Sequence, residues 1–385
     1  MIRRACRLPP ARSCLLLGPR QTGKSTLVRS LLPPRAWSVD LLQQDAFLRY
    51  SKEPERFRLE VEARVRAGTR VVFVDEIQRV PALLEEIHGL IETHRVRFLL
   101  TGSSARKLRR GSANLLAGRA STRRLHPLTL AEQGQLFDLE RTLRYGSLPA
   151  VVTGSASAAR DLLASYADTY LREEVQAEAL VRNLGGFARF LDLVAAENGG
   201  IVNASAVARD AALAVRTVQE YYQILEDTLI GYRLEPWRRS ARARLVGHPR
   251  FYLFDTGVTN ALTGRLGATP DPILRGRLFE QWVVLECLRL LDYRRAEARL
   301  YYWRTHNGAE VDLLIERHGR LRLAVGIKSK KRIAGADLSG LRSFAEVHPR
   351  VRRVVVAEVP EAYRFGGVDV LPYRLFLERL PRLLR

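Results

Sequence analysis

The sequence of 385 residues predicts an α/β protein in which a helical segment separates two α/β units. Two observations predict this class. Residues 1 to about 130 alternate helix-like stretches with three short apolar runs, CLLLG, VVFVDE and RFLLTG. Residues from about 250 to 385 show the same alternation around the runs FYLFD, RLYYWR, AEVDLLIE, LRLAVGIK and RRVVVAEV. At roughly 150 residues per domain, this length suggests two or three domains.

The three N-terminal runs are apolar without interruption and end in turn signals. Such runs are typical of strands that are buried on both faces of a parallel sheet. Helix-like stretches lie between them, with the sequences KSTLVRSLL and PALLEEIHGLIETH. Strands and helices that alternate along the chain predict a sheet covered by helices.

A glycine-rich loop joins the first predicted strand to the first predicted helix. It matches the pattern G-x-x-x-x-G-K-[ST] in full. Its glycines let backbone N–H groups surround phosphates, and the following helix adds its positive N-terminus. We expect Lys24 to reach the β and γ phosphates and Ser25 to ligate Mg²⁺, so the expected cofactors are ATP and Mg²⁺. The expected nucleotide-binding residues are Gly18, Pro19, Arg20, Gln21, Thr22, Gly23, Lys24, Ser25 and Thr26.

Polar residues that follow the next two strands complete the prediction of a hydrolytic site. Asp75 ends one strand, and an Asp at that place in a P-loop fold helps Ser25 to hold magnesium. The adjacent Glu76 is expected to polarise the attacking water. Thr101 ends the next strand and is expected to hydrogen-bond the water or the γ-phosphate. Arg119 is a candidate for stabilising transition-state charge, either in its own subunit or in a neighbouring one.

The middle of the chain is predicted to be helical. The stretch SAARDLLASYADTYLREEVQAEAL lacks proline and glycine and carries apolar residues at helical spacing. Two shorter patterns follow, NASAVARDAAL and AVRTVQEYYQILEDTLI, with Asn203 and Thr217 as expected helix caps. Together they suit a helix-turn-helix or winged-helix module. The small-residue stretch VTGSASAAR near residue 152 is the expected linker.

Several motifs follow one another along the chain: GPRQTGKST, VVFVDEIQRVP, FLLTGSSARKL, LAGRA, HPLTLAEQ, RYGSLPAVV, YADTYLREEV, FYLFDTGV, GRLFEQWVVLECL, YYWRTHNGAEVDLLIE and IKSKK. In this order they resemble the motifs of prokaryotic AAA-type ATPases that carry a C-terminal domain of unknown function. The resemblance implies an AAA-type core at residues 1–150, a winged-helix-like segment at 151–245, and an α/β domain at 246–385. The last domain is expected to be similar to restriction endonucleases of the PD-(D/E)XK type.

The nuclease-like region has candidates for a metal-dependent site but lacks one carboxylate. Metal-dependent phosphodiester cleavage requires clustered carboxylates and a lysine, here Glu280, Asp312 and Lys328. Where such folds carry Glu-x-Lys, this chain reads Gly326-Ile327-Lys328. Glu310 is two residues from Asp312 on the same strand and is a candidate substitute. We favour a degenerate site over an active nuclease.

Charge and composition suggest partners. Lys plus Arg number 63 against 41 Asp plus Glu, a net charge of +22, which favours a polyanion such as DNA. The excess is mostly arginine and is spread along the chain. The three cysteines, Cys6, Cys14 and Cys287, lack metal spacing and fit a reducing cytoplasm. No apolar run is long enough to span a membrane.

Two further functions stay open at this point. The first expectation is an ATPase that works as a homo-oligomer and binds nucleic acid through its C-terminal region. A nucleotide-dependent switch or adaptor acting on a protein partner is one alternative, and an active DNA-cleaving enzyme is the other. ATP hydrolysis that responds to DNA would favour the first.

Overall fold

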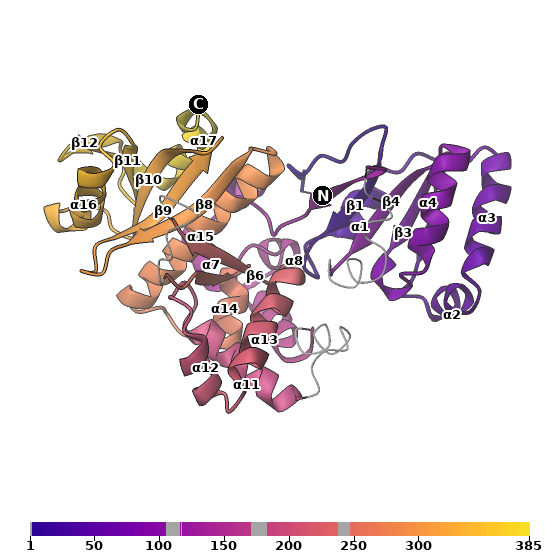
Figure 1. Ribbon diagram of the computed structural model, residues 1–385, viewed down its shortest axis with the longest axis horizontal. Coiled ribbons are helices and arrows are strands. Elements are labelled where there is room, and N and C mark those ends of the chain that lie inside the picture. The colour runs from indigo at the N-terminus through magenta and orange to yellow at the C-terminus, as the bar shows by residue number, and fades with distance from the viewer. Residues whose placement is uncertain (1, 105–115, 117, 171–182, 238–246) are drawn as a thin grey trace.

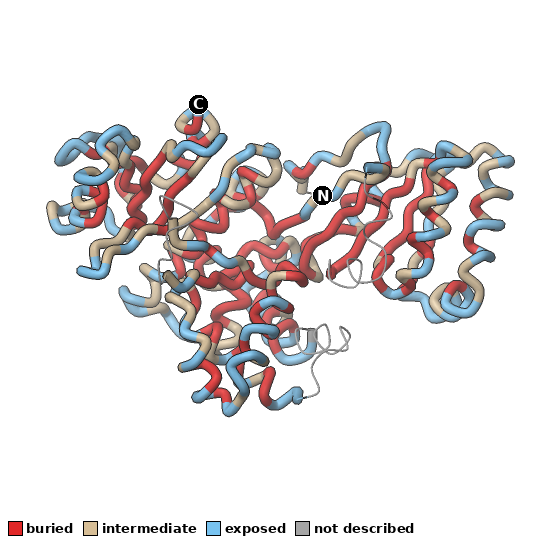
Figure 2. The backbone as a smooth tube through the Cα atoms, in the orientation of Figure 1, coloured by how far each residue is buried: buried red, intermediate tan, exposed pale blue. Residues whose placement is uncertain are grey.

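The computed structural model describes residues 2–104, 116, 118–170, 183–237 and 247–385. Figure 1 shows the N-terminal α/β unit at one end of the molecule and the C-terminal sheet at the other, with helices between and below them. Buried apolar side chains form clusters in the N-terminal unit, among the middle helices and on the two faces of the C-terminal sheet. Buried segments accordingly run through the strands of both sheets (Figure 2).

Five strands form the N-terminal sheet in the order β2-β3-β4-β1-β5, and neighbouring strands pair in parallel. They are β1 (Ser13–Leu17), β2 (Trp37–Asp40), β3 (Val71–Asp75), β4 (Arg97–Gly102) and β5 (Ala120–Arg124). The three predicted runs are β1, β3 and β4, and all three are confirmed. β4 lies between β1 and β3, so the loop after each of these strands opens at the same edge of the sheet.

Helices follow the strands of this unit as the alternating pattern predicts. The α-helices are α1 (Lys24–Arg29), α2 (Gln44–Lys52), α3 (Pro54–Arg66) and α4 (Leu83–His94), and a short 3-10 turn is η1 (Ile77–Arg79). α3 begins with Pro54, whose missing N–H is not needed at the first position of a helix.

A run of short helices connects the N-terminal sheet to the middle of the chain. They are α6 (Leu130–Gln133), η2 (Gly134–Leu136), α7 (Leu139–Tyr145), α8 (Pro149–Thr153), α9 (Ala156–Ser165) and the π-helical turn η3 (Tyr166–Tyr170). The predicted linker near residue 152 is wrong, because α8 and α9 pack there and leave only Gly154 and Ser155 between them. Ser155 caps α9 by accepting a hydrogen bond from the Ala158 N–H at 3.2 Å. Part of the long predicted helix, residues 171–182, lies outside the described residues.

Three helices then form a compact group: α11 (Leu184–Ala196), α12 (Ala204–Asp210) and α13 (Val215–Asp227). The predicted cap at Asn203 is confirmed, since its side chain accepts from the Ala206 N–H at 3.0 Å. The predicted cap at Thr217 is wrong. α13 begins two residues earlier, after the extended residue Ala214, so Thr217 lies inside the helix.

A hairpin follows α13 and joins two parts of the molecule. Its strands are β6 (Gly231–Pro236) and β7 (Arg250–Leu253), and α14 (Thr256–Leu262) comes next. Ile201, between α11 and α12, forms an isolated antiparallel bridge with Arg250. β6 also pairs in parallel with β8 (Ala298–Arg304), at Glu235 and Pro236. The expected boundary at residues 245/246 therefore falls inside this hairpin.

The C-terminal sheet has eight strands in the order β12-β13-β11-β10-β9-β8-β6-β7. Its remaining strands are β8 (Ala298–Arg304), β9 (Glu310–Arg317), β10 (Arg320–Lys328), β11 (Arg352–Ala357), β12 (Tyr363–Phe365) and β13 (Val368–Pro372). β8, β9 and β10 are antiparallel, whereas β11 is parallel to β10. Each of the five predicted C-terminal runs contains a strand.

Three α-helices and a 3-10 turn accompany this sheet: α15 (Pro272–Tyr293), η4 (Gly335–Leu338), α16 (Ser339–Val347) and α17 (Tyr373–Leu383). α15 and α17 pack on one face and α16 on the other. In the part of the chain that the structure describes, no helix combines the length and the apolar character that crossing a bilayer requires.

Buried polar contacts fix α15 to the connecting helices. The Glu286 carboxylate accepts from the Leu130 N–H at 3.0 Å, and the Arg289 guanidinium donates to the Ser147 hydroxyl at 3.0 Å and the Phe254 carbonyl at 2.9 Å. Burial raises the pKa of Glu286 to about 7, although Arg289 opposes this shift. One helix thus touches the N-terminal connection, the middle helices and the C-terminal sheet.

Candidate functional site

The loop from Gly18 to Gly23 is held in the shape that its two glycines permit. A Cβ atom at Gly18 would lie 2.3 Å from the Leu125 carbonyl oxygen, so no larger residue fits there. Gly23 has a φ of 88°, in the left-handed region that favours glycine. The Thr22 hydroxyl closes the loop by donating to the Pro19 carbonyl at 2.9 Å. α1 begins immediately after Gly23.

Lys24 lies inside this loop rather than in solvent. Its side chain is 5% exposed, and its ammonium donates to the carbonyl oxygens of Gly18 at 2.8 Å and Pro19 at 3.1 Å. The Glu76 carboxylate lies 3.9 Å from Nζ. The structure therefore brings Lys24 and Glu76 together, as the sequence predicts for a phosphate-binding lysine beside a catalytic carboxylate.

The hydroxyl groups of Ser25 and Thr101 converge on the carboxylate of Asp75. The Ser25 hydroxyl donates to Asp75 Oδ1 at 2.9 Å, and the Thr101 hydroxyl donates to the same oxygen. Asp75 is buried, which raises the pKa of its carboxyl group, while the two hydroxyl donors oppose the shift. These contacts depend on the strand order, because Thr101 ends β4, the strand between β1 and β3.

Glu76 adopts a backbone conformation that is rare for its residue type, with φ 57° and ψ 48°. Residues held in this left-handed region cluster at functional sites, because the surrounding structure has to stabilise the strain. Here the Glu76 N–H donates to the Thr101 hydroxyl at 3.1 Å. The Gln78 amide donates to the Glu76 carboxylate and, at 3.0 Å, to the Ser103 hydroxyl. Sequence reasoning missed Gln78, although it follows Glu76 by two residues.

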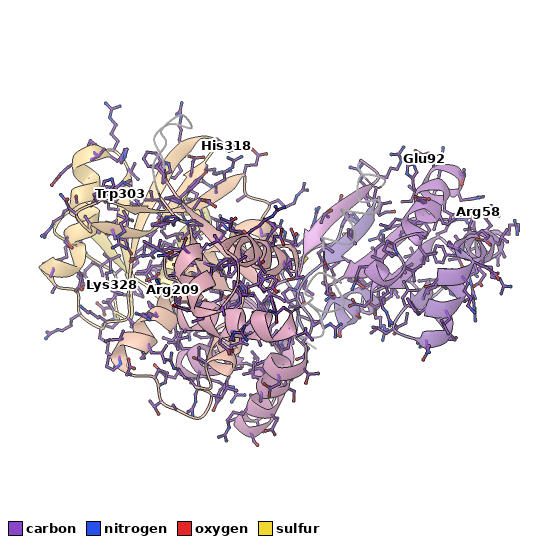
Figure 3. The ribbon with its side chains drawn as sticks, turned by 60° about the horizontal axis from the view of Figure 1, so that its bottom comes forward. Arg58, Glu92, Arg209, Trp303, His318 and Lys328 are labelled. Atoms are coloured by element: carbon purple, nitrogen blue, oxygen red, sulfur yellow. The ribbon has the colours of Figure 1, made fainter. Side chains whose placement is uncertain are left out.

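Arg119 is not brought to this loop in its own chain. It directly precedes β5, whose first residue Ala120 pairs with Ser13 at the start of β1, whereas the loop follows the end of β1. Its guanidinium Nε lies 2.6 Å from the Glu92 carboxylate of α4. Figure 3 shows Glu92 on the outer part of the N-terminal unit. Within its own chain, Arg119 therefore lies at the end of the sheet that is away from the loop.

Arg4 is a residue of this region that sequence reasoning missed. Its guanidinium donates to the Thr22 carbonyl of the loop at 2.6 Å and to the His126 carbonyl at 2.6 Å. It also donates to the Glu132 carboxylate at 2.9 Å and to the Tyr293 hydroxyl, at the end of α15, at 3.2 Å. One buried side chain thus connects the phosphate loop to the C-terminal region. An isolated arginine near the start of an arginine-rich chain carries no motif that reveals this.

The C-terminal candidates also come together, but a cation of the protein itself lies among them. Arg250, on β7, places Nη1 2.9 Å from the Glu280 carboxylate and donates from Nη2 to the Glu310 carboxylate. The Tyr252 hydroxyl donates to Glu280 at 2.7 Å. Burial, and then the charge of Asp312, raises the pKa of Glu280 to about 7.

Asp312 and Lys328 form the second half of this group. Asp312 Oδ2 accepts from the Ile327 N–H at 2.6 Å and lies 3.3 Å from Lys328 Nζ. Burial alone would lower the pKa of Lys328, but the charge and hydrogen bond of Asp312, together with the charges of Glu280 and Asp337, raise that pKa. A Cβ at Gly326 would lie 3.4 Å from Leu341 and 3.7 Å from Val355, so a glutamate there would meet apolar side chains.

These residues do not fit a magnesium site. The carboxylates of Glu280 and Glu310 both pair with Arg250. The Asp312 carboxylate accepts from a backbone N–H and pairs with Lys328. Across the described residues, no group of three or more His, Cys, Asp or Glu side chains is arranged to hold a metal ion. The candidate substitute Glu310 lies beside Arg250 instead of completing a carboxylate set with Asp312.

Comparison with known protein families divides the chain into three matched regions. Residues 11–133 match the model described as an AAA domain. Residues 136–269 and 275–376 each match a domain of unknown function, DUF8612 and DUF4143 respectively. Each model covers less than half of the chain.

Relatives of the whole chain are similarly without assigned function. An uncharacterized protein of Mycobacterium tuberculosis, Rv2008c, is 29% identical over 376 residues, which cover 96% of this chain and 81% of that protein. An uncharacterized protein of Haemophilus influenzae is 21% identical over 279 residues, 66% of this chain and 70% of that protein.

Solved structures give only distant likenesses. The Hsp104–ADP complex of S. cerevisiae has a TM-score of 0.28 and 13% identity, and the match covers 74% of this chain and 41% of that chain. Drosophila ORC bound to AT-rich DNA and Cdc6 has a TM-score of 0.23 and 13% identity, covering 66% and 86%. TM-scores this low do not establish a shared fold. The AAA match over residues 11–133 and the geometry of Gly18 to Thr101 together support a P-loop ATPase of the AAA type.

Proposed function

We propose that this protein hydrolyses ATP in its N-terminal unit and couples the reaction to nucleic acid bound by its C-terminal half. One observation carries the first part. The glycine-rich loop places Lys24 and Ser25 beside Asp75, Glu76 and Thr101, which come from two other strands. A phosphoryl-transfer site needs such a group, because its catalysis consists of positioning and charge stabilisation.

Each of these side chains has a role that its position supports. Lys24 would neutralise the β and γ phosphates within the loop. The Ser25 hydroxyl and Asp75 carboxylate, 2.9 Å apart, are oxygen ligands of the kind that Mg²⁺ prefers. When bound there, Mg²⁺ would neutralise charge on the phosphate oxygens. Glu76 would orient the attacking water, and Thr101 holds both acidic residues in place.

Arg119 supports a homo-oligomeric form of this site. It lies at the opposite edge of the sheet from the loop, so it can reach a nucleotide only on a neighbouring subunit. A cation supplied in this way stabilises transition-state charge in other P-loop enzymes. We therefore propose that hydrolysis is completed at a subunit boundary, with Arg119 acting in trans.

The middle and C-terminal regions support a binding role. The order of α11, the Ile201 bridge, α12, α13 and the β6–β7 hairpin supports the proposal of a winged-helix-like module, which would place a helix in a nucleic-acid groove. We propose that β8 to β11, flanked by α15 and α16, form the PD-(D/E)XK nuclease-like fold that the sequence predicts. Because Arg250 lies among the carboxylates, we propose that this second fold binds without cleaving. The division into residues 1–150, 151–245 and 246–385 stays a prediction.

Glu76→Gln tests the proposed reaction. The amide keeps the size of the side chain but cannot polarise water as a carboxylate does. We expect ATP turnover to fall by roughly 100-fold or more while ATP binding is retained, since general-base catalysis contributes about 10²–10⁴-fold. Phosphate release, measured with and without DNA, and nucleotide binding are the readouts.

Glu55→Gln is the matched control, because Glu55 is an exposed residue of α3 and undergoes the same chemical change. Normal hydrolysis by Glu76→Gln would show that the catalytic assignment is wrong. Slow wild-type turnover that is indifferent to DNA would instead favour a nucleotide-dependent switch acting on a protein partner.

A further inference from the structure

A cavity of about 1170 Å³ lies between the N-terminal sheet and the C-terminal half. One wall is formed by residues Cys6–Pro10 and by the end of β5, the edge strand of the N-terminal sheet. The opposite wall consists of β6, the end of α15 and the start of β8. Pockets for small ligands measure about 300–1,000 Å³, so this cavity is large for one.

The polar part of its lining is strongly basic. Seven arginines line the cavity against two carboxylates, Glu235 and Asp292. The Asp292 carboxylate accepts from the buried His126 ring at 2.7 Å, and Arg233 pairs with Glu226 at 3.0 Å. The other six arginines come from both walls and are Arg7, Arg123, Arg124, Arg294, Arg295 and Arg299.

These six arginines share a feature that sets them apart. Within residues 2–104, 116, 118–170, 183–237 and 247–385, no ion pair of up to 4.0 Å joins any of them to a carboxylate. Elsewhere arginines such as Arg250, Arg275 and Arg289 pair with acids. Five of the six are exposed, and Arg123 is half-buried. Arg123 and Arg124 share the charge of Asp292, but six guanidinium groups without an ion pair still leave the cavity strongly positive, which attracts a polyanion.

Beneath the arginines the cavity is apolar. Leu8, Leu288 and Leu300 line it with partly exposed aliphatic side chains. A duplex presents its phosphates outward and keeps its bases paired inside, so its bases cannot contact the apolar part of the cavity. A single strand exposes base faces that leave water readily, while its phosphates meet cations.

We infer that this cavity binds single-stranded nucleic acid, with the six arginines on its phosphates and the leucines under its bases. The inference rests on the proposed nucleic-acid function and names its site. An acidic peptide would also meet the arginines. The net charge of +22 nevertheless extends over the whole chain, which suits a long ligand that carries a charge on every unit.

The experiment compares two triple variants by fluorescence anisotropy. Arg294→Gln/Arg295→Gln/Arg299→Gln removes three cavity charges. Arg350→Gln/Arg364→Gln/Arg379→Gln removes three exposed charges that do not line the cavity. The probes are a labelled single-stranded oligonucleotide, its duplex and a labelled poly-glutamate peptide, each titrated at several salt concentrations.

We expect the wild type to prefer the single strand. The cavity variant should bind it at least about tenfold more weakly and lower its salt slope by about 2, since each lost phosphate contact lowers the slope by about 0.7. The control variant should lose less than threefold, and basal ATP hydrolysis should not change in either.

Three outcomes would overturn the inference, and they separate its failure from that of the proposed function. Equal losses in both variants would mean general surface attraction, and preference for the duplex would exclude a single-strand site. In both cases nucleic-acid binding itself would stand. Binding of poly-glutamate without binding of either oligonucleotide would overturn the nucleic-acid function as well and identify an acidic protein segment as the occupant.

Discussion

Single side chains decide what each half of this molecule can do. Glu76 lies in a strained backbone conformation with its carboxylate 3.9 Å from Lys24, and the proposed hydrolysis of ATP depends on this pair. Arg250 has the reverse effect in the C-terminal half, because its guanidinium lies between Glu280 and Glu310. An arginine is a permanent cation, so it satisfies the carboxylates that would otherwise be free to bind a metal ion.

Arg250→Met should destabilise the protein strongly at neutral pH. Removing one partner of a buried ion pair leaves uncompensated charge and costs about 3–5 kcal/mol. The pKa of Glu280 is already raised to about 7. The loss should therefore be smaller at pH 5, where the carboxyl group holds its proton, and full at pH 8. Denaturant unfolding at both pH values measures it.

The matched control is Arg352→Met, which removes an exposed ion pair with Asp369 and should cost less than about 1 kcal/mol. An equal cost for both substitutions would show that Arg250 is not the buried counter-charge described here. Robust Mg²⁺-dependent DNA cleavage by the wild type, lost in Asp312→Ala, would contradict the degenerate site itself.

The residues that sequence reasoning found and missed differ in one respect. Lys24, Asp75 and Glu76 stand at fixed spacings around strands, so the pattern alone predicts their chemistry. Arg4 and Arg250 act through contacts with residues far along the chain, at Tyr293 and Glu310. No fixed spacing in the sequence identifies such contacts. The chain also has so many arginines that Arg4 and Arg250 do not stand out among them.

At the scale of elements, strands were predictable and their order was not. Uninterrupted apolar runs identify β1, β3 and β4, because a strand that is buried on both faces of a sheet carries apolar residues at successive positions. The position of β4 between its neighbours depends on how the crossovers pack. The same holds for β6, whose pairing with β8 joins residues 66 positions apart in the chain. Local patterns cannot specify either pairing.

The long helix α15 makes the stability of the whole protein depend on pH. The pKa of Glu286 is raised by burial from 4.5 to about 7, so the folded state holds this proton more tightly than the unfolded state. Its contribution to stability is full below pH 4.5 and is lost as the pH rises to 7. We expect Glu286→Gln to flatten the decline in unfolding free energy between pH 5 and 8 by roughly 2 kcal/mol.

Glu346→Gln, at an exposed position of α16, is the control and should leave the pH profile unchanged. The measurement is urea unfolding at several pH values. If Glu286→Gln kept the wild-type profile, the buried carboxyl group would not be the source of the pH dependence.

At the scale of the whole molecule, the proposed nucleic-acid cavity and the phosphate loop meet at the end of α15. Tyr293 lines the cavity, and its hydroxyl accepts from the His126 N–H at 3.0 Å and from Arg4 at 3.2 Å. Arg4 in turn holds the Thr22 carbonyl. A ligand that displaces the end of α15 would therefore shift Arg4 and, through it, the phosphate loop.

Tyr293→Phe should weaken this communication while leaving the chemistry intact. The variant loses only the hydroxyl, so basal ATP hydrolysis should stay within about twofold of the wild type. Stimulation by single-stranded DNA should fall roughly fivefold, the lower end of typical coupling between sites. Tyr363→Phe, on the exposed strand β12, is the control. Unchanged stimulation in Tyr293→Phe would show that the coupling follows another route.

The β6–β7 hairpin has a consequence for how this protein can be divided or recombined. It forms two strands of the C-terminal sheet, yet it belongs to the region that matches a different family model. A truncated chain starting at residue 275 would expose the unpaired edge of β8, and a chain ending at 269 would leave β6 without that neighbour. Open strand edges promote aggregation. The two regions should therefore be expressed, exchanged or fused to other proteins only as one piece.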